Sequence, residues 1–191
     1  QGQGNGSSGV GIYLQNDPGF ARVESIATGV NAATITLIGT GSSTAGRGVY
    51  ILQGGYITSK DGSITISGQG LASGSEGILL YDTARIYSTG NASISIAGTS
   101  NGSSGIASST NANAIGGASD AGNITLTSDT MDLQNVSIRS TGQLLVQQGQ
   151  TATTMGLGDS STGTLNLTNT ELGNIVPGFS QITFGRSDSN G

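Results

Sequence analysis

The chain has 191 residues, of which 34 are glycine, 9% are charged and 4% are aromatic, and its net charge is −5. A hydrophobic fraction of 34% with this modest charge is too apolar for a disordered segment. The absence of cysteine and histidine excludes a disulfide framework and the commonest general bases and metal ligands. Six scattered basic residues argue against a nucleic-acid partner, and no apolar run is long enough to span a membrane. We therefore expect no cofactor, no metal, no nucleic acid and no membrane insertion.

The first stretch, 1–47, has the loosest pattern. Gly9–Leu14 reads as a glycine-led strand, and the residues 16–19, Asn-Asp-Pro-Gly, give a strong turn signal. Gly9 precedes the next glycine-led strand, at Gly48, by 39 residues, whereas later strands of this kind lie 28 or 29 apart. We expect about ten extra residues here, in an insertion near 15–22. Because the chain begins without a methionine or a signal peptide, we expect it to be a segment of a longer protein.

From residue 48 the chain repeats, most regularly over 48–98. Each unit has a glycine-led apolar strand such as 48–52, a short isoleucine-led strand such as 57–59, and an Ile-Thr-Ile strand such as 64–66. β-Branched residues in period-two alternation predict strands, and Gly, Asn and Asp predict the turns between them. Apolar triplets of the third kind begin at Ile35, Ile64, Ile94 and Ile124, spaced 29, 30 and 30 residues apart.

Three short strands in about 30 residues are too few for a propeller blade and predict a stack of coils. The whole chain, 1–191, is thus expected to be a single all-β domain, a right-handed parallel β-helix (β-solenoid) of about six three-strand coils of roughly 30 residues. Equivalent positions of successive coils would form aliphatic ladders in the core. The predicted ladder residues are Ile35, Leu37, Ile64, Ile66, Ile94, Ile96, Ile124 and Leu126.

The later part of the chain departs from this regularity. The segment 99–120, rich in Ser, Ala, Asn and Gly, predicts one weak strand at 105–107 and an excursion from the solenoid surface. The stretch 121–191 predicts about two more coils, with a helical turn at 170–175 ended by Pro177. No amphipathic helix that could cap either end of the stack is apparent.

No constellation of residues points to catalysis. Acidic residues do not recur at the coil spacing, and the nearest pair, Asp129 and Asp132, would face opposite sides of a strand. We expect the chain not to be an enzyme. Tyr50 and Tyr87 alternate with inward isoleucines and are candidate surface contacts. Their ladder partners would be Leu79 and Thr58, so no aromatic stripe is expected.

The coil pattern resembles the filamentous haemagglutinin-like family of large bacterial secreted proteins. The similarity is carried by Gly48–Ile51, Ile57–Ser59 and Gly62–Gly68, and by a C-terminal unit, Thr154–Gly158 with Gly163–Leu167, Glu171–Leu172 and Gly178–Arg186. The resemblance implies a right-handed parallel β-helix, export across the outer membrane of a Gram-negative or cyanobacterial cell, and a role in adhesion, matrix or surface fibres.

The expected function is therefore that of an extracellular structural or adhesive β-solenoid module of a large surface or secreted protein. Open strand edges at the ends of a solenoid need partners. We expect head-to-tail contacts with copies of the chain or with adjacent modules, which would build a filament. Cell-surface glycans are a further expected partner. The alternatives are a carbohydrate-binding module and, less favoured, a polysaccharide-active β-helix enzyme.

Overall fold

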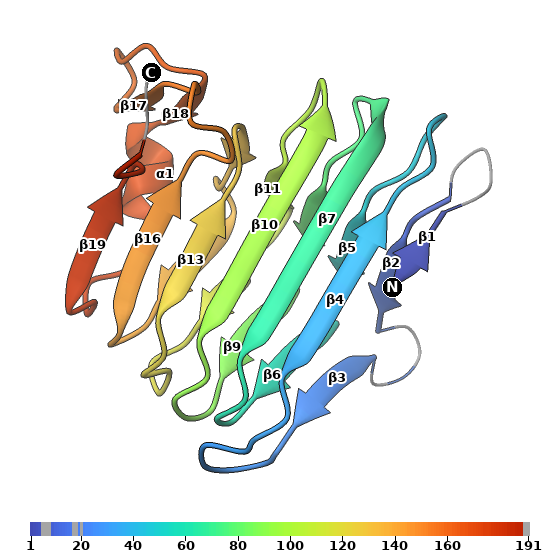
Figure 1. The fold of residues 1–191 in the computed structure, drawn as a ribbon, viewed down its shortest axis with the longest axis vertical. Coiled ribbons are helices and arrows are strands. Elements are labelled where there is room, and N and C mark those ends of the chain that lie inside the picture. The colour runs from blue at the N-terminus through green and yellow to red at the C-terminus, as the bar shows by residue number, and fades with distance from the viewer. Residues whose placement is uncertain (5–8, 17–18, 20, 189–191) are drawn as a thin grey trace.

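The computed structural model describes residues 1–4, 9–16, 19 and 21–188 (Figure 1). Strands dominate this part of the chain and stack in three parallel sheets. Sheet A, the largest, contains β1 (Gly2–Gln3), β4 (Ile35–Thr40), β7 (Ile64–Ser73), β10 (Ile94–Asn101), β13 (Ile124–Thr127), β16 (Gln143–Gln147) and β19 (Gln181–Phe184). Sheet B contains β2 (Ile12–Gln15), β5 (Val49–Leu52), β8 (Ile78–Tyr81), β11 (Ile106–Ser109) and β14 (Met131–Asp132). Sheet C contains β3 (Arg22–Ser25), β6 (Tyr56–Ser59), β9 (Arg85–Ser88), β12 (Asn113–Gly116) and β15 (Val136–Arg139).

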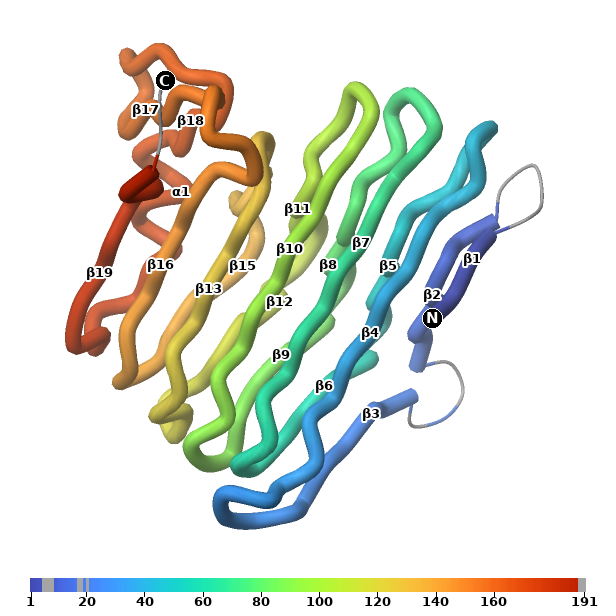
Figure 2. Tube along the Cα trace, in the orientation of Figure 1, coloured from blue at the N-terminus to red at the C-terminus, as the bar shows by residue number. Residues whose placement is uncertain are grey.

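Each of the first five coils, which run from β1 to β15, contributes one strand to each sheet. Figure 2 shows the path of one such coil, in which the chain leaves the long strand β7 and passes through β8 and β9, behind the strands of sheet A, before it enters β10. Every strand of these three sheets pairs in parallel with the strand at the same place in the neighbouring coil. Three columns of parallel strands confirm the predicted all-β, solenoid-like architecture.

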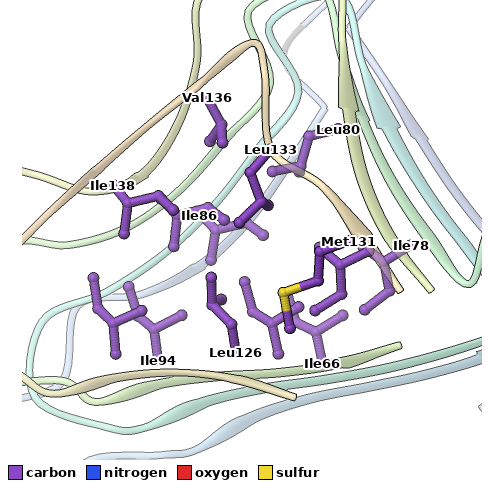
Figure 3. Close-up of a cluster of buried hydrophobic side chains, with 14 of the residues drawn as sticks. Ile66, Ile78, Leu80, Ile86, Ile94, Leu126, Met131, Leu133, Val136 and Ile138 are labelled. Atoms are coloured by element: carbon purple, nitrogen blue, oxygen red, sulfur yellow. The ribbon is translucent and has the colours of Figure 1, made fainter. Parts of the chain in front are cut away.

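Two ladders of aliphatic side chains line the inside of sheet A. The first ladder contains Ile35, Ile64, Ile94, Ile124 and Leu144, and the second contains Leu37, Ile66, Ile96, Leu126 and Val146. Along β7 buried and exposed residues alternate without a break, as expected for a strand with one face in the core. Side chains of sheets B and C, including Ile78, Leu80, Ile86 and Ile138, fill the opposite side of the core (Figure 3). Stacking thus builds a core that no coil could form alone.

Facing glycines close the corner between sheets A and B. A Cβ atom placed on Gly68 of β7 would lie 2.3 Å from the carbonyl oxygen of Gly77, which immediately precedes β8. The same clash occurs one coil earlier between Gly39 and Gly48, at 2.1 Å. Only glycine allows two backbones to approach this closely. At this corner only backbone atoms lie between sheets A and B, whereas side chains fill the space between the sheets elsewhere.

The first coil differs in its register from the expectation. β2 pairs Ile12 with Val49, so Gly11, not Gly9, is the counterpart of Gly48. Nine residues, 26–34, separate β3 from β4, whereas four, 60–63, separate β6 from β7. The longest addition therefore lies at 26–34. Within the insertion expected near 15–22, Asp17, Pro18 and Phe20 lie outside the described residues.

The segment 99–120 is not an excursion, contrary to the expectation. It supplies the end of β10 and both β11 and β12, which pair in register with β8 and β9. This coil is hard to recognise in the sequence because polar residues occupy some of its inward positions. Asn113 is 1% exposed, accepts a hydrogen bond from the backbone N–H of Ala84 at 2.9 Å and donates to the Ser108 hydroxyl at 3.0 Å. Buried polar groups are tolerated when they are hydrogen-bonded in this way.

A C-terminal lid covers the last coil of sheets B and C. We use this name for residues 155–177, which comprise the parallel pair β17 (Met155–Leu157) and β18 (Leu165–Leu167) and the helix α1 (Asn169–Gly173). The coil beneath is short, since only 20 residues separate Ile124 from its ladder neighbour Leu144. Helix α1 matches the predicted helical turn, but the expectation that no helix caps the stack is wrong.

Glu171 fastens this lid to the edge of the solenoid. Its Oε1 accepts a hydrogen bond from the backbone N–H of Leu133 at 2.8 Å, and its Oε2 accepts from the N–H of Thr168, the N-cap of α1, at 2.9 Å. Asn174 donates from Nδ2 to the Leu133 carbonyl at 2.7 Å, and the N–H of Val176 donates to the Ile138 carbonyl at 2.9 Å. One carboxylate thus completes a capping box and pairs an open strand edge.

Replacing Glu171 should loosen the lid before the rest of the solenoid. The variant Glu171→Ala leaves the N–H groups of Leu133 and Thr168 unpaired, which should cost about 2–4 kcal/mol of unfolding free energy. Glu171→Gln keeps one acceptor and should lose roughly half as much. Denaturant unfolding measures the loss, and hydrogen exchange should show faster exchange of the Leu133 amide. Unchanged protection of that amide in Glu171→Ala would contradict this role.

Candidate binding surface

Large apolar side chains cover part of the outer face of sheet B. In β5 the inward residues Val49 and Ile51 are fully buried, so Tyr50 and Leu52 project outward. In β8 the same alternation turns Leu79 and Tyr81 outward. A solvent-facing strand side normally carries polar residues, so these positions need a separate explanation.

Three tyrosines from consecutive coils meet on this face. The ring centroids of Tyr13 and Tyr50 lie 5.5 Å apart and those of Tyr50 and Tyr81 lie 6.1 Å apart, with interplanar angles of 76° and 78°. Edge-to-face pairs at these distances are favourable for aromatic rings. Tyr13 remains 52% exposed, whereas Tyr50 and Tyr81 are half-buried. We call Tyr13, Tyr50 and Tyr81 the tyrosine cluster.

Two leucines beside the rings are buried without belonging to the inner core. Leu52 is 7% and Leu79 is 4% exposed, and each lies in register with a member of the tyrosine cluster, Tyr81 and Tyr50 respectively. The rings and leucines thus form a small apolar patch on the outside of the solenoid.

An ion pair borders the patch. The Arg47 guanidinium carbon lies 4.7 Å from the Tyr50 ring centroid, a cation–π distance. Arg47 Nε is 2.7 Å from Glu76 Oε2, in an orientation that makes no hydrogen bond between them. Burial raises the pKa of the Tyr50 hydroxyl, and Arg47 opposes that shift. The tyrosine therefore stays neutral and can serve as a hydrogen-bond donor beside its apolar ring.

Tyr87 belongs to a different surface. It projects from β9 of sheet C, and its ring centroid lies 5.9 Å from that of Tyr56 on β6. Tyr56 accepts a hydrogen bond from Arg22 Nη1 at 3.2 Å. The two predicted contact residues, Tyr50 and Tyr87, are thus placed on separate sheets and not brought together.

The expectation that no aromatic stripe exists is wrong for sheet B. That expectation follows from in-register partners, whereas Tyr50 and Tyr81 meet as diagonal neighbours, which long side chains can bridge. The direct pair Tyr13 and Tyr50 was hidden by the two-residue register error in the first coil. Diagonal positions at the coil spacing were the signal that could have revealed the tyrosine cluster.

The acidic residues of the turns tie neighbouring coils together. The Asp61 carboxylate accepts hydrogen bonds from the backbone N–H groups of Gly29 at 2.7 Å and Asn91 at 3.3 Å, and these bonds lower its pKa. Asp129 accepts from the N–H of Gly149 at 2.9 Å, whereas Asp132 accepts within its own turn, from the N–H of Gln134 at 3.3 Å. No group of three acidic side chains that could hold a metal ion occurs among the described residues.

Asp120 differs from these acids because it is wholly buried. Its carboxylate accepts hydrogen bonds from the N–H groups of Gly122 at 2.9 Å and Ser88 at 3.3 Å, at the corner between sheets C and A. Burial raises the pKa of Asp120 to about 6, and the two hydrogen bonds only partly offset it. This carboxyl therefore titrates within a mildly acidic range.

Comparisons with known proteins add no relative. No protein-family model, curated protein or solved structure matches the chain. In the part of the chain that the structure describes, no helix has the length and apolarity required to cross a membrane.

Asp120 should make the protein more stable in mild acid. Folding raises its pKa from 3.8 to about 6, so the folded chain binds the proton more tightly. The unfolding free energy should therefore fall as pH rises from about 4 to about 6.5, by on the order of 2 kcal/mol. Below about pH 4 the lowered pKa of Asp61 should reverse the trend, since that carboxylate loses its stabilising bonds on protonation. Denaturation at several pH values measures the profile, and Asp120→Asn should remove the fall while Asp61→Asn leaves it in place.

Proposed function

We propose that the chain is an extracellular structural and adhesive module of a large bacterial surface or secreted protein, folded as a right-handed parallel β-helix. The right hand is supported by the near-universal handedness of crossover connections between parallel strands. Secretion across the outer membrane is supported by the resemblance of Gly48–Ile51 and the C-terminal unit to filamentous haemagglutinin-like proteins.

The observation that carries the adhesive part of this proposal is the tyrosine cluster. It presents adjoining aromatic rings and hydroxyls on a rigid sheet, outside the core that the fold requires. Exposed apolar patches of this kind mark interaction sites. A ring face packs against the C–H face of a sugar while the hydroxyl bonds to sugar oxygens, so the proposed contact is with cell-surface glycans.

Glycan binding should depend on the rings and not on their hydroxyls alone. Tyr13→Ala should weaken binding of a neutral oligosaccharide identified on a glycan array by about tenfold, the equivalent of one ring contact. Tyr13→Phe keeps the ring and should bind within about threefold of the unaltered chain. Calorimetric titration gives both affinities. Equal affinity for the Ala and Phe variants would refute the cluster as the contact surface, and turnover of a bound glycan would refute the non-enzymatic role.

We further propose that the module contacts copies of itself or adjacent modules at its strand edges. At the C-terminal side the lid covers sheets B and C, while sheet A continues to β19. Within the described residues β19 pairs only with β16, and Ile182 on it is 45% exposed. Edge strands with unpaired backbone groups and an apolar side chain favour strand addition.

Self-association should therefore depend on β19. Light scattering of the isolated chain should show concentration-dependent oligomers, and Ile182→Lys should shift them to monomers by charging the edge. Thr183, which shares the strand, provides the control Thr183→Ser, which should leave association unchanged. A chain that stays monomeric at every concentration would rule out stacking through this edge.

A further inference from the structure

A groove crosses the outer face of sheet C beside Tyr87. Its volume is about 400 Å³, and its walls include Arg85, Tyr87, Ser137 and Arg139. The floor is formed by β12, whose outward residues Ala114 and Gly116 are much smaller than Arg85 and Tyr87 of β9 and Arg139 of β15. Ala114 pairs in register with Arg85 on one side and with Ser137 on the other. The groove therefore exists because one coil lacks large outward side chains between two coils that have them.

The backbone conformation at the floor of the groove requires a glycine. Gly116 has a φ of +76°, a left-handed conformation that favours glycine. A Cβ atom at this position would lie 2.0 Å from the Arg139 carbonyl oxygen. No larger residue can fill the groove at this point without moving β15.

Two arginines without carboxylate partners flank the groove. The ion pairs among the described residues involve Arg22, Arg47 and Arg186, each with a nearby Glu or Asp. The exposed guanidinium groups of Arg85 and Arg139 have no such partner in that part of the chain. In a chain with a net charge of −5, two uncompensated cations on one groove favour an anionic ligand.

A second groove of about 500 Å³ continues the first. The two share Ala112 and Ser137, and the second is lined by the amide side chains of Asn111, Gln134, Asn135 and Asn174. Together they extend across successive coils from β9 to the end of α1, parallel to the stacking direction. This shape suits an extended polymer, and the exposed amides of Gln134 and Asn135 suit its hydroxyl groups, since an amide both donates and accepts hydrogen bonds.

We infer that the joined grooves bind an anionic polysaccharide, with Arg85 and Arg139 on its acidic groups and the Tyr87 ring against a sugar face. Guanidinium groups bind carboxylates through two parallel hydrogen bonds. The arginines lie two strands apart, about 10 Å along the stack, so a chain with regularly repeated acidic groups can engage both. This inference rests on the proposed glycan-binding function and adds the chemical class of the ligand at a second surface.

Titration of the 191-residue chain with oligogalacturonates tests the inference. Arg85→Ala and Arg139→Ala should each weaken binding by about tenfold or more, as expected for a lost charge-assisted bond. Lys60→Ala, which removes an equal charge outside both grooves, should leave the affinity unchanged. Raising the salt concentration from about 50 to about 500 mM should weaken binding to the unaltered chain. A sulfated dextran distinguishes sulfate from carboxylate as the acidic group, and binding of either through these arginines supports the inference.

Four results would overturn it. Arginine variants that bind oligogalacturonate as well as the unaltered chain would remove the groove from recognition. A neutral dextran bound as tightly as the acidic polymers would exclude charge recognition, and single-stranded DNA bound equally tightly through the same arginines would exclude a saccharide site. Neutral glycans bound through Tyr13, with no response to acidic ones, would refute the inference while leaving the proposed function intact. Acidic polymers bound through the arginines, with no binding of neutral glycans through Tyr13, would support the inference while refuting the tyrosine cluster as a glycan contact.

Discussion

In-register hydrogen bonding between parallel coils is the constraint on which the rest of this structure depends. Because Ile35, Ile64, Ile94 and Ile124 pair directly, whatever one coil places at a position is repeated about 4.8 Å away in the next. Inside, this repetition produces continuous aliphatic ladders. Outside, it would set like charges beside one another at an unfavourable distance, which accounts for a chain with 9% charged residues.

The same constraint makes departures from the repeat informative. Where a coil replaces a large outward residue with a small one, as at Ala114 and Gly116, a groove opens between its neighbours. Where several coils place aromatic residues near one another, as at Tyr13, Tyr50 and Tyr81, a patch forms. Neither feature requires a loop or an inserted domain. The proposed binding surfaces arise because outward side chains differ in size from coil to coil while the backbone repeats.

The sequence was sufficient to predict strands, their parallel stacking and their three-column arrangement, since each ladder position repeats its residue type. Prediction from the sequence failed where hydrogen-bonded polar residues, instead of aliphatic ones, occupy the buried positions. The coil formed by β10, β11 and β12 carries Ser108 and Asn113 at buried positions. There hydrogen bonds within and between coils stabilise the stack, whereas aliphatic contacts stabilise it elsewhere. Because these residues are polar, they produce no periodic hydrophobic pattern from which their buried positions could be predicted. The tyrosine cluster was missed for a geometric reason, since its contacts run diagonally across the sheet and depend on a register that loop lengths disguise.

The lid has a consequence for how such proteins can change in length. Its hydrogen bonds to the last coil, from Glu171, Asn174 and Val176, all end on backbone atoms of Leu133, Gln134 or Ile138, and its Leu165 and Leu167 are buried in the aliphatic core. Every coil presents equivalent backbone atoms, whatever its side chains. Duplication or loss of a whole coil within the gene would therefore leave the lid a surface to bind. Length can evolve by copying coils, while the terminator that closes two of the three sheets is kept unchanged.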